Sequence, residues 1–190
     1  MKKIAIFASG NGSNAENIIN YFQSHPDEGE VALVVCNRKE AGVYERAARL
    51  GVPCVHIPKR EINEATIILP LLKKYEVEFI VLAGFLLMIP DFLIQAYKRR
   101  MINVHPSLLP KYGGKGMHGH YVHEAIVAAK EKESGITIHY VSEVCDEGEV
   151  IFQVKTDILP TDTPKIVEEK IHALEKEYFP KVVSSLLKAL

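Results

Sequence analysis

The sequence predicts an α/β protein with a mostly parallel central sheet and helices on both faces. Two observations predict this class. Between residues 3 and 105, short apolar runs of strand length alternate with amphipathic stretches of helical length, as in chains that wind around a parallel sheet. The apolar runs are also continuous rather than alternating with polar residues, which is typical of parallel strands buried on both faces.

The first half of the chain supplies five of the predicted strands. The strands are expected at residues 3–8, 31–36, 54–57, 79–83 and 101–105, and the helices at 13–23, 43–50 and 61–75. Gly51 is a favoured cap after the second helix. Pro70 lies inside the third helical stretch, so we expect it to bend or break that helix. The apolar run 79–90 has about half the roughly 20 residues that a membrane helix needs, and we interpret it as a buried strand and the loop leaving it.

The second half of the chain has a different character. Residues 106–120 are rich in glycine and proline and are expected to form a long loop before a helix at 121–130. Two strands, at 136–141 and 150–155, are expected to be joined by a turn. Thr163 and Pro164 begin the last helix with a polar cap followed by proline in the first turn. No linker or repeat is visible, so one domain over residues 1–190 is the simplest prediction.

Composition narrows the class of protein. The chain has 190 residues, 25% of them charged, and a net charge of -1, which gives no overall attraction to nucleic acid or to an anionic membrane. Cys36, Cys54 and Cys145 are an odd set without a CxxC pair, which argues against a disulfide framework or a structural zinc site. No signal segment is apparent. We expect a cytoplasmic monomer or homodimer that holds no metal.

A glycine-rich segment, SGNGSNA at residues 9–15, joins the first strand to the first helix. Its glycines let the backbone approach an anion, and the helix start offers unpaired N–H groups and a positive dipole end, so a phosphate group is the natural ligand. Two other interpretations stay open. In one, Ser13 and Glu16 form a capping box without a ligand. In the other, the GxGxxA pattern binds a dinucleotide, with Arg38 favouring NADP over NAD.

A second polar feature lies at the end of the fifth predicted strand. Asn103 and His105 are two residues apart, so they share a face of that strand. Pro106 cannot donate to a sheet, so the pair lies at the strand's carboxyl end, where open α/β sheets bind ligands. An amide beside an imidazole offers two hydrogen-bond donors to one developing oxyanion, as acyl transfer requires. The alternative is a polar strand end without a catalytic role.

The whole segment NVHPSLLP, residues 103–110, resembles the signature of the folate-dependent formyltransferases, whose amino domain is Rossmann-like. Further blocks along nearly the whole chain are similar to this family. They are SGNGSN at 9–14, VLAGF at 81–85, DEGEVIFQ at 146–153, HALE at 172–175 and YFP at 178–180. The glycine-rich block is similar to the branch that acts on glycinamide ribonucleotide. Methionyl-tRNA formyltransferase carries an added carboxyl-terminal domain, which we do not expect here.

The resemblance implies an enzyme that transfers the formyl group of 10-formyltetrahydrofolate to the amine of glycinamide ribonucleotide in purine synthesis. Residues 1–105 then form the phosphoribosyl-binding half, and residues 106–190 the folate-binding and carboxyl-terminal helix half. Asn103 is expected to donate its amide to the formyl oxygen. His105 is expected to be cationic and to steady the same oxygen. Asp146 is expected to hold His105 and to relay the proton that the attacking amine loses.

The resemblance also implies the residues that contact each small-molecule substrate. For the ribonucleotide these are Gly12, Ser13, Asn14, Gly84, Pro106, His172 and Glu175. For the folate cosubstrate they are Arg60, Leu86, Leu87, Met88, Ile89, Asn103, Val141, Glu143 and Asp146. Leu87 stands where family members often carry an arginine for the folate glutamate tail, and Arg60 is the expected substitute. Lys176 stands where the family usually has a histidine.

Three histidines lie close together in the glycine-rich segment 111–123. They are His118, His120 and His123. We interpret the segment as a mobile lid whose glycines let it close over the substrates. A metal site formed by the histidines is the alternative.

Overall fold

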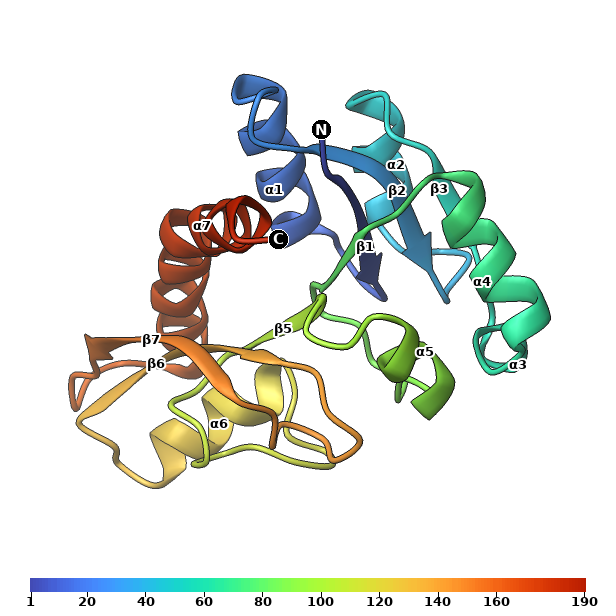
Figure 1. Cartoon of the computed structure of the whole chain (residues 1–190). Helices are drawn as coiled ribbons and strands as arrows, with labels where there is room; N and C mark the ends of the chain where they lie inside the picture. The colour runs from blue at the N-terminus through green and yellow to red at the C-terminus, as the bar shows by residue number, and fades with distance from the viewer.

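The computed structural model describes all residues from 1 to 190 and contains one seven-stranded sheet (Figure 1). The strand order is β3-β2-β1-β4-β5-β6-β7. The strands are β1 (Lys3–Ala8), β2 (Glu30–Cys36), β3 (Cys54–His56), β4 (Phe79–Leu82), β5 (Met101–His105), β6 (Glu133–Tyr140) and β7 (Val150–Asp157). The first five pair in parallel, whereas β6 is antiparallel to both β5 and β7.

Seven helices cover the two faces of this sheet. They are α1 (Ser13–Ser24), α2 (Val43–Arg49), α3 (Lys59–Ile62), α4 (Ala65–Lys74), α5 (Asp91–Ala96), α6 (His120–Ala128) and α7 (Pro164–Lys188). Buried side chains of α1, α2, α6 and α7 pack together on one face, and those of α3, α4 and α5 pack on the other. Figure 1 shows α7 beside α1, with α4 on the opposite side. The predicted α/β class, with helices on both faces, is therefore confirmed.

The sequence predicts one helix over residues 61–75 that Pro70 bends or breaks, and the single helix and the break at Pro70 are wrong. The helical segment divides earlier, into α3 and α4, and α4 continues through Pro70. The division occurs because the Asn63 side chain donates to the Lys59 carbonyl, 2.7 Å away, and Glu64 adopts an extended backbone before α4. Asparagine side chains often compete in this way with the hydrogen bonds of a continuing helix.

Two further elements differ from the prediction. The short helix α5 was not predicted, because its six residues are too few for a helical pattern to stand out. The connection between β6 and β7 is not a tight turn but a loop over residues 141–149. No helix of the structure has the length and apolar character needed to cross a membrane.

The β6–β7 pair is packed so closely that it requires a glycine. A methyl group added at Gly135 on β6 would overlap the carbonyl oxygen of Val154 on β7. Because a backbone atom cannot move aside as a flexible side chain can, we predict that Gly135→Ala lowers the free energy of unfolding by about 1–3 kcal/mol. Urea titration followed by circular dichroism measures this change.

Gly10→Ala is the matched control, because a methyl group there meets no atom within 4 Å. The control is expected to change stability by less than about 0.5 kcal/mol. Equal unfolding midpoints for the two variants would contradict the close approach of β6 and β7.

Candidate functional site

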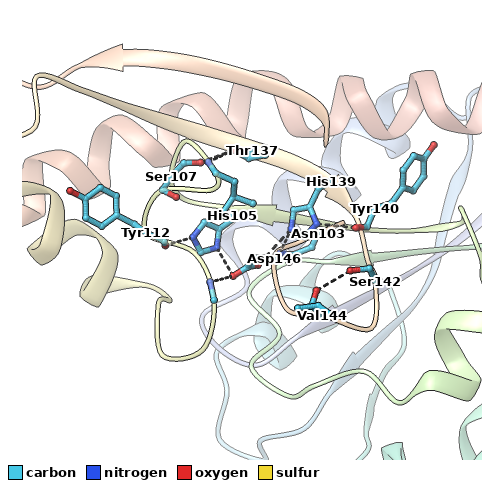
Figure 2. Close-up of polar contacts among 12 residues, drawn as sticks. Asn103, His105, Ser107, Tyr112, Thr137, His139, Tyr140, Ser142, Val144 and Asp146 are labelled. Carbon is cyan, nitrogen blue, oxygen red and sulfur yellow. Dashed lines mark hydrogen bonds and ion pairs between the residues drawn. The ribbon is translucent and has the colours of Figure 1, made fainter. Parts of the chain in front are cut away.

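The polar residues at the end of β5 lie opposite a second polar pair on β6. In the antiparallel register, Asn103 faces His139 and His105 faces Thr137. Residues directly opposite in such a pair point to the same side of the sheet. The β5–β6 edge therefore gathers an amide and two imidazoles on one face (Figure 2).

Asp146 reaches this face from the loop between β6 and β7. One carboxylate oxygen lies 3.5 Å from His105 Nδ1, and the other lies 3.6 Å from His139 Nε2. The backbone N–H of Gly114 donates to the carboxylate at 2.9 Å. The structure thus brings the three predicted catalytic side chains, Asn103, His105 and Asp146, into one cluster, and Figure 2 shows them pointing toward one another.

His139 belongs to the same cluster and was missed by the sequence analysis. Its Nδ1 lies 2.9 Å from the Tyr140 carbonyl oxygen and must donate to it. Its Nε2 is then free to accept from the Asn103 amide at 3.1 Å. His139 therefore fixes the direction of that amide. The only signal in the sequence was its place in a predicted strand, which did not reveal its partner on β5.

His105 is held by a backbone carbonyl and almost fully buried, with 4% of its surface exposed. Its Nε2 donates to the Tyr112 carbonyl oxygen at 2.7 Å. Burial lowers the pKa of His105 below its ordinary value of 6.5, and the Asp146 charge and the Tyr112 carbonyl offset this only in part. The expectation that His105 is cationic is therefore wrong for the chain without substrate. Its Nδ1 faces the carboxylate without a hydrogen bond.

For the pKa of Asp146, the neighbouring groups outweigh the effect of burial. Burial raises the pKa of its carboxyl group, but the His139 side chain, the attraction that His105 exerts when it is protonated, and the Gly114 N–H together lower it further, to below its ordinary value of 3.8. The carboxylate is therefore ionised at neutral pH. Its backbone has a positive φ of 58°, a conformation that Asp tolerates better than most residues.

The glycine-rich loop presents free backbone donors. Gly12 caps α1 with a φ of 82° and no side-chain cap, so the capping-box interpretation is wrong. Glu16 instead forms ion pairs with Arg46 and Arg49. The first helical hydrogen bond runs from the Glu16 N–H to the Gly12 carbonyl, which leaves the N–H groups of Ser13 and Asn14 available to an anion.

Glu175 on α7 meets this loop from the other half of the chain. Its carboxylate accepts from the Asn14 amide at 2.9 Å and is 6% exposed. Burial raises the pKa of Glu175, and the Asn14 hydrogen bond opposes that shift. His172 lies one turn earlier, exposed, with its Nε2 3.9 Å from Glu168. The structure thus joins Asn14 and Glu175, whereas His172 forms no hydrogen bond or ion pair with the loop.

The predicted folate residues separate into an apolar group and an exposed group. Leu87, Ile89 and Val141 pack in the apolar layer on the α3–α5 face of the sheet. Four members are exposed: Leu86 and Met88 on the β4–α5 loop, Arg60 on α3 and Glu143 on the β6–β7 loop. The other two, Asn103 and Asp146, belong to the polar cluster described above and are half-buried.

Two of these exposed residues already have a partner. Arg60 is paired with Glu64, and Glu143 accepts a hydrogen bond from Gln95. Gly84, with a φ of 71°, and Pro106 follow the neighbouring strands β4 and β5. Leu87 and Ile89 follow the end of β4, whereas Val141, whose N–H donates to the Met101 carbonyl, lies beside the start of β5. No hydrogen bond or ion pair joins Arg60 to these residues.

The three histidines of the predicted lid do not form a metal site. No cluster of three or more histidine, cysteine or acidic side chains is suited to a metal ion. His118 and His120 contact the Tyr121 ring. His123 is buried on α6.

The NADP alternative depends on a different place in the fold. Arg38 lines a cavity of about 950 Å³ beside Gly10 and Asn11, but Ala41 is the one hydrophobic residue in its wall. An adenine ring needs apolar surface to pack on, so this cavity does not favour a dinucleotide.

The balance of burial and charge at His105 generates a pH-dependent prediction. Because Asp146 raises the pKa of His105, Asp146→Asn is expected to lower that pKa further. Proton NMR titration of the ring Cε1–H measures it, with the resonance assigned by its loss in His105→Gln. Glu147→Gln, which removes an exposed neighbouring carboxylate, serves as control. A pKa above 6.5, or a rise in Asp146→Asn, would contradict this account of the site.

Comparison with known proteins identifies a family for this chain. Residues 2–183 match the formyl transferase family. The chain is 40% identical to a phosphoribosylglycinamide formyltransferase of Bacillus subtilis, covering 98% of this chain and 95% of that protein. It is 36% identical to the chloroplastic phosphoribosylglycinamide formyltransferase of Arabidopsis thaliana, covering 97% of this chain but 65% of that longer protein.

A solved structure gives the same result. A glycinamide ribonucleotide transformylase from Geobacillus kaustophilus superimposes with a TM-score of 0.88 at 38% identity, covering 98% of this chain and 99% of that one. The match over nearly the full length, together with the buried cluster at the β5–β6 edge, confirms the resemblance inferred from the sequence. The chain belongs to the formyl transferase family, in its phosphoribosylglycinamide formyltransferase branch.

Proposed function

We propose that this chain transfers the formyl group of 10-formyltetrahydrofolate to the amine of glycinamide ribonucleotide, in cytoplasmic purine synthesis. The observation that carries the proposal is the cluster of the buried His105 with the half-buried Asn103 and Asp146. It lies at the carboxyl end of β5, on a sheet whose neighbouring strand ends carry an anion-binding loop and an apolar group of side chains. An acyl transfer between a phosphorylated acceptor and an aromatic donor requires these three features together.

The ribonucleotide is assigned to the glycine-rich loop. The N–H groups of Ser13 and Asn14 suit its phosphate, because a helix start favours an anion. Glu175, held by Asn14 at 2.9 Å, suits the ribose hydroxyls, and His172 flanks the phosphate. Gly84 and Pro106 border the path of the amine toward the cluster. Because Glu175 belongs to residues 106–190, the proposed phosphoribosyl site draws on both halves of the proposed single domain.

The folate is assigned to the apolar group. Leu87, Ile89 and Val141 offer a surface on which a pteridine ring can pack. Leu86, Met88 and Glu143 then border that slot from its exposed side. Arg60 stays the proposed partner of the glutamate tail. The two ligands are thus expected to meet at Asn103.

The proposed chemistry follows from which hydrogen-bond donors are free. One N–H of the Asn103 amide is committed to His139, so the other is available to the formyl oxygen as negative charge develops on it. Asp146, ionised in the free chain, accepts the proton that the attacking amine loses and returns it to N10 of the departing folate, directly or through water. His105 Nδ1 takes a proton from water as the negative charge develops, donates to the oxyanion beside Asp146, and returns that proton to water when the intermediate collapses. These reaction steps need no metal ion and no covalent enzyme intermediate.

A direct assay tests the proposal. Purified protein, glycinamide ribonucleotide and 10-formyltetrahydrofolate are expected to yield tetrahydrofolate, detected by absorbance, together with formylated ribonucleotide, detected by mass spectrometry. Tetrahydrofolate formed at the same rate without the ribonucleotide would instead indicate a hydrolase.

In the same assay, Asp146→Asn is expected to lower kcat by about a hundred- to ten-thousand-fold, because proton transfer loses its carboxylate. Glu147→Gln is the control, and near-normal turnover of Asp146→Asn would reject the role of Asp146.

The position of His139 gives a second expected outcome. His139→Phe keeps a ring of similar size but removes the acceptor for the Asn103 amide, so the amide can turn away from the formyl oxygen. We predict that kcat falls about tenfold or more, with the KM for each substrate changed by less than about threefold. His139→Gln restores an acceptor and is expected to recover part of the rate. Equal activity of wild type and His139→Phe would exclude this positioning role.

A further inference from the structure

Ser9 is a buried serine that follows β1 and precedes the glycines of the phosphate loop. Its exposed fraction is 1%. The hydroxyl donates to Asn37 Oδ1 at 2.5 Å and accepts from the Leu86 N–H at 2.9 Å. Both roles of the hydroxyl are thus fixed, because Asn37 Oδ1 can only accept and a backbone N–H can only donate.

This hydroxyl belongs to a line of polar contacts across the carboxyl edge of the sheet. The His56 side chain, on β3, donates to the Asn37 carbonyl at 3.3 Å, and Asn37 follows β2. Ser9 follows β1, and Leu86 lies in the loop after β4. Since β3, β2, β1 and β4 are consecutive neighbours in the sheet, the line joins four strand ends and terminates at the β4–α5 loop.

Residues 84–89 of that loop have few other polar contacts. Their two hydrogen bonds both go to Ser9: the Ser9 N–H donates to the Gly84 carbonyl at 3.1 Å, and the Leu86 N–H donates to the Ser9 hydroxyl. Otherwise the loop is held by the packing of Phe85, Leu87 and Ile89 against the core. Apolar packing is non-directional, so the hydrogen bonds to Ser9 define the orientation of the loop backbone.

We propose that Ser9 is a positioning residue for the formyl donor: its hydroxyl holds the Leu86 amide and so sets the shape of the apolar slot. The proposal rests on the proposed function, because it takes residues 86–89 as the folate slot. The phosphate loop has separate support, since the Gly10 carbonyl accepts from Val43 N–H and Gly12 packs against Val43. Loss of the hydroxyl therefore affects the donor more than the ribonucleotide.

The test compares Ser9→Ala with Ser184→Ala. Ser184 is also a buried serine whose hydroxyl binds a side chain, Glu28, but it lies on α7. Ser9→Ala is expected to raise the KM for 10-formyltetrahydrofolate about five- to tenfold, because the Leu86 amide loses its acceptor. The KM for the ribonucleotide and kcat are expected to change by less than about twofold. Ser184→Ala is expected to lower the melting temperature without changing either KM.

The partner residue sharpens the test. Asn37→Leu removes the acceptor that orients the hydroxyl and is expected to raise the donor KM by a similar factor, whereas Asn37→Asp keeps an acceptor and recovers most of the loss. In the double variant Ser9→Ala/Asn37→Leu the two effects do not multiply, because both act through one hydrogen bond. The proposal would be overturned if the KM factors of the two single variants multiplied in the double variant. It would also be overturned if the donor KM were unchanged in Ser9→Ala, or if the KM values for both substrates rose equally.

Two readouts without turnover separate this inference from the proposed function. Hydrogen exchange of a peptide covering residues 84–89 is expected to speed up in Ser9→Ala but not in Ser184→Ala. The Kd for tetrahydrofolate, measured by fluorescence, is expected to rise in parallel with the donor KM. If the wild type binds tetrahydrofolate but transfers no formyl group, the proposed function fails. Hydrogen exchange and the Kd for tetrahydrofolate still test the positioning role of Ser9 in that case. Unchanged exchange and Kd in Ser9→Ala overturn the positioning role.

Discussion

The antiparallel pairing of β5 with β6 is the constraint on which the whole site depends. The sheet is parallel up to β5 and reverses at its next strand. This reversal sets His139 opposite Asn103, and the chain leaving β6 returns over the same edge with Asp146. A shift of the register by one residue would turn the side chains of one strand to the other face. On the other side of β6, Gly135 packs closely against Val154 of β7.

Burial determines the protonation states within the cluster. An isolated imidazole in a poorly solvated place favours its neutral form, which is why His105 has a lowered pKa although Asp146 is near. Asp146 stays ionised because the Gly114 N–H and two histidine rings outweigh its own desolvation. The free site therefore holds a ready base and an imidazole whose Nδ1 can still take a proton. Exclusion of water also strengthens every charge interaction that develops during a reaction.

Errors in the predicted fold occurred where local signals were weak or competed. Pro70 was the strongest local breaker, but the helix divides at Asn63, where a side chain takes the carbonyl of Lys59. The short helix α5 was missed because six residues carry little periodicity. Ser13 and Glu16 matched a capping pattern, but Glu16 is engaged by Arg46 and Arg49, and long-range ion pairs cannot be read from a four-residue motif.

The sequence by itself determined the alternation of strands and helices and the grouping of Asn103 with His105, because periodicity and a proline stop are local properties. Family resemblance added Asp146. Only the tertiary structure decided that His139, 36 residues from Asn103 along the chain, orients the Asn103 amide, and that Ser9 holds a loop 77 residues away. It also decided the burial that lowers the pKa of His105. These features depend on contacts between residues far apart in the chain and on the removal of water from the site. Neither can be predicted from the residues adjacent to a position in the sequence.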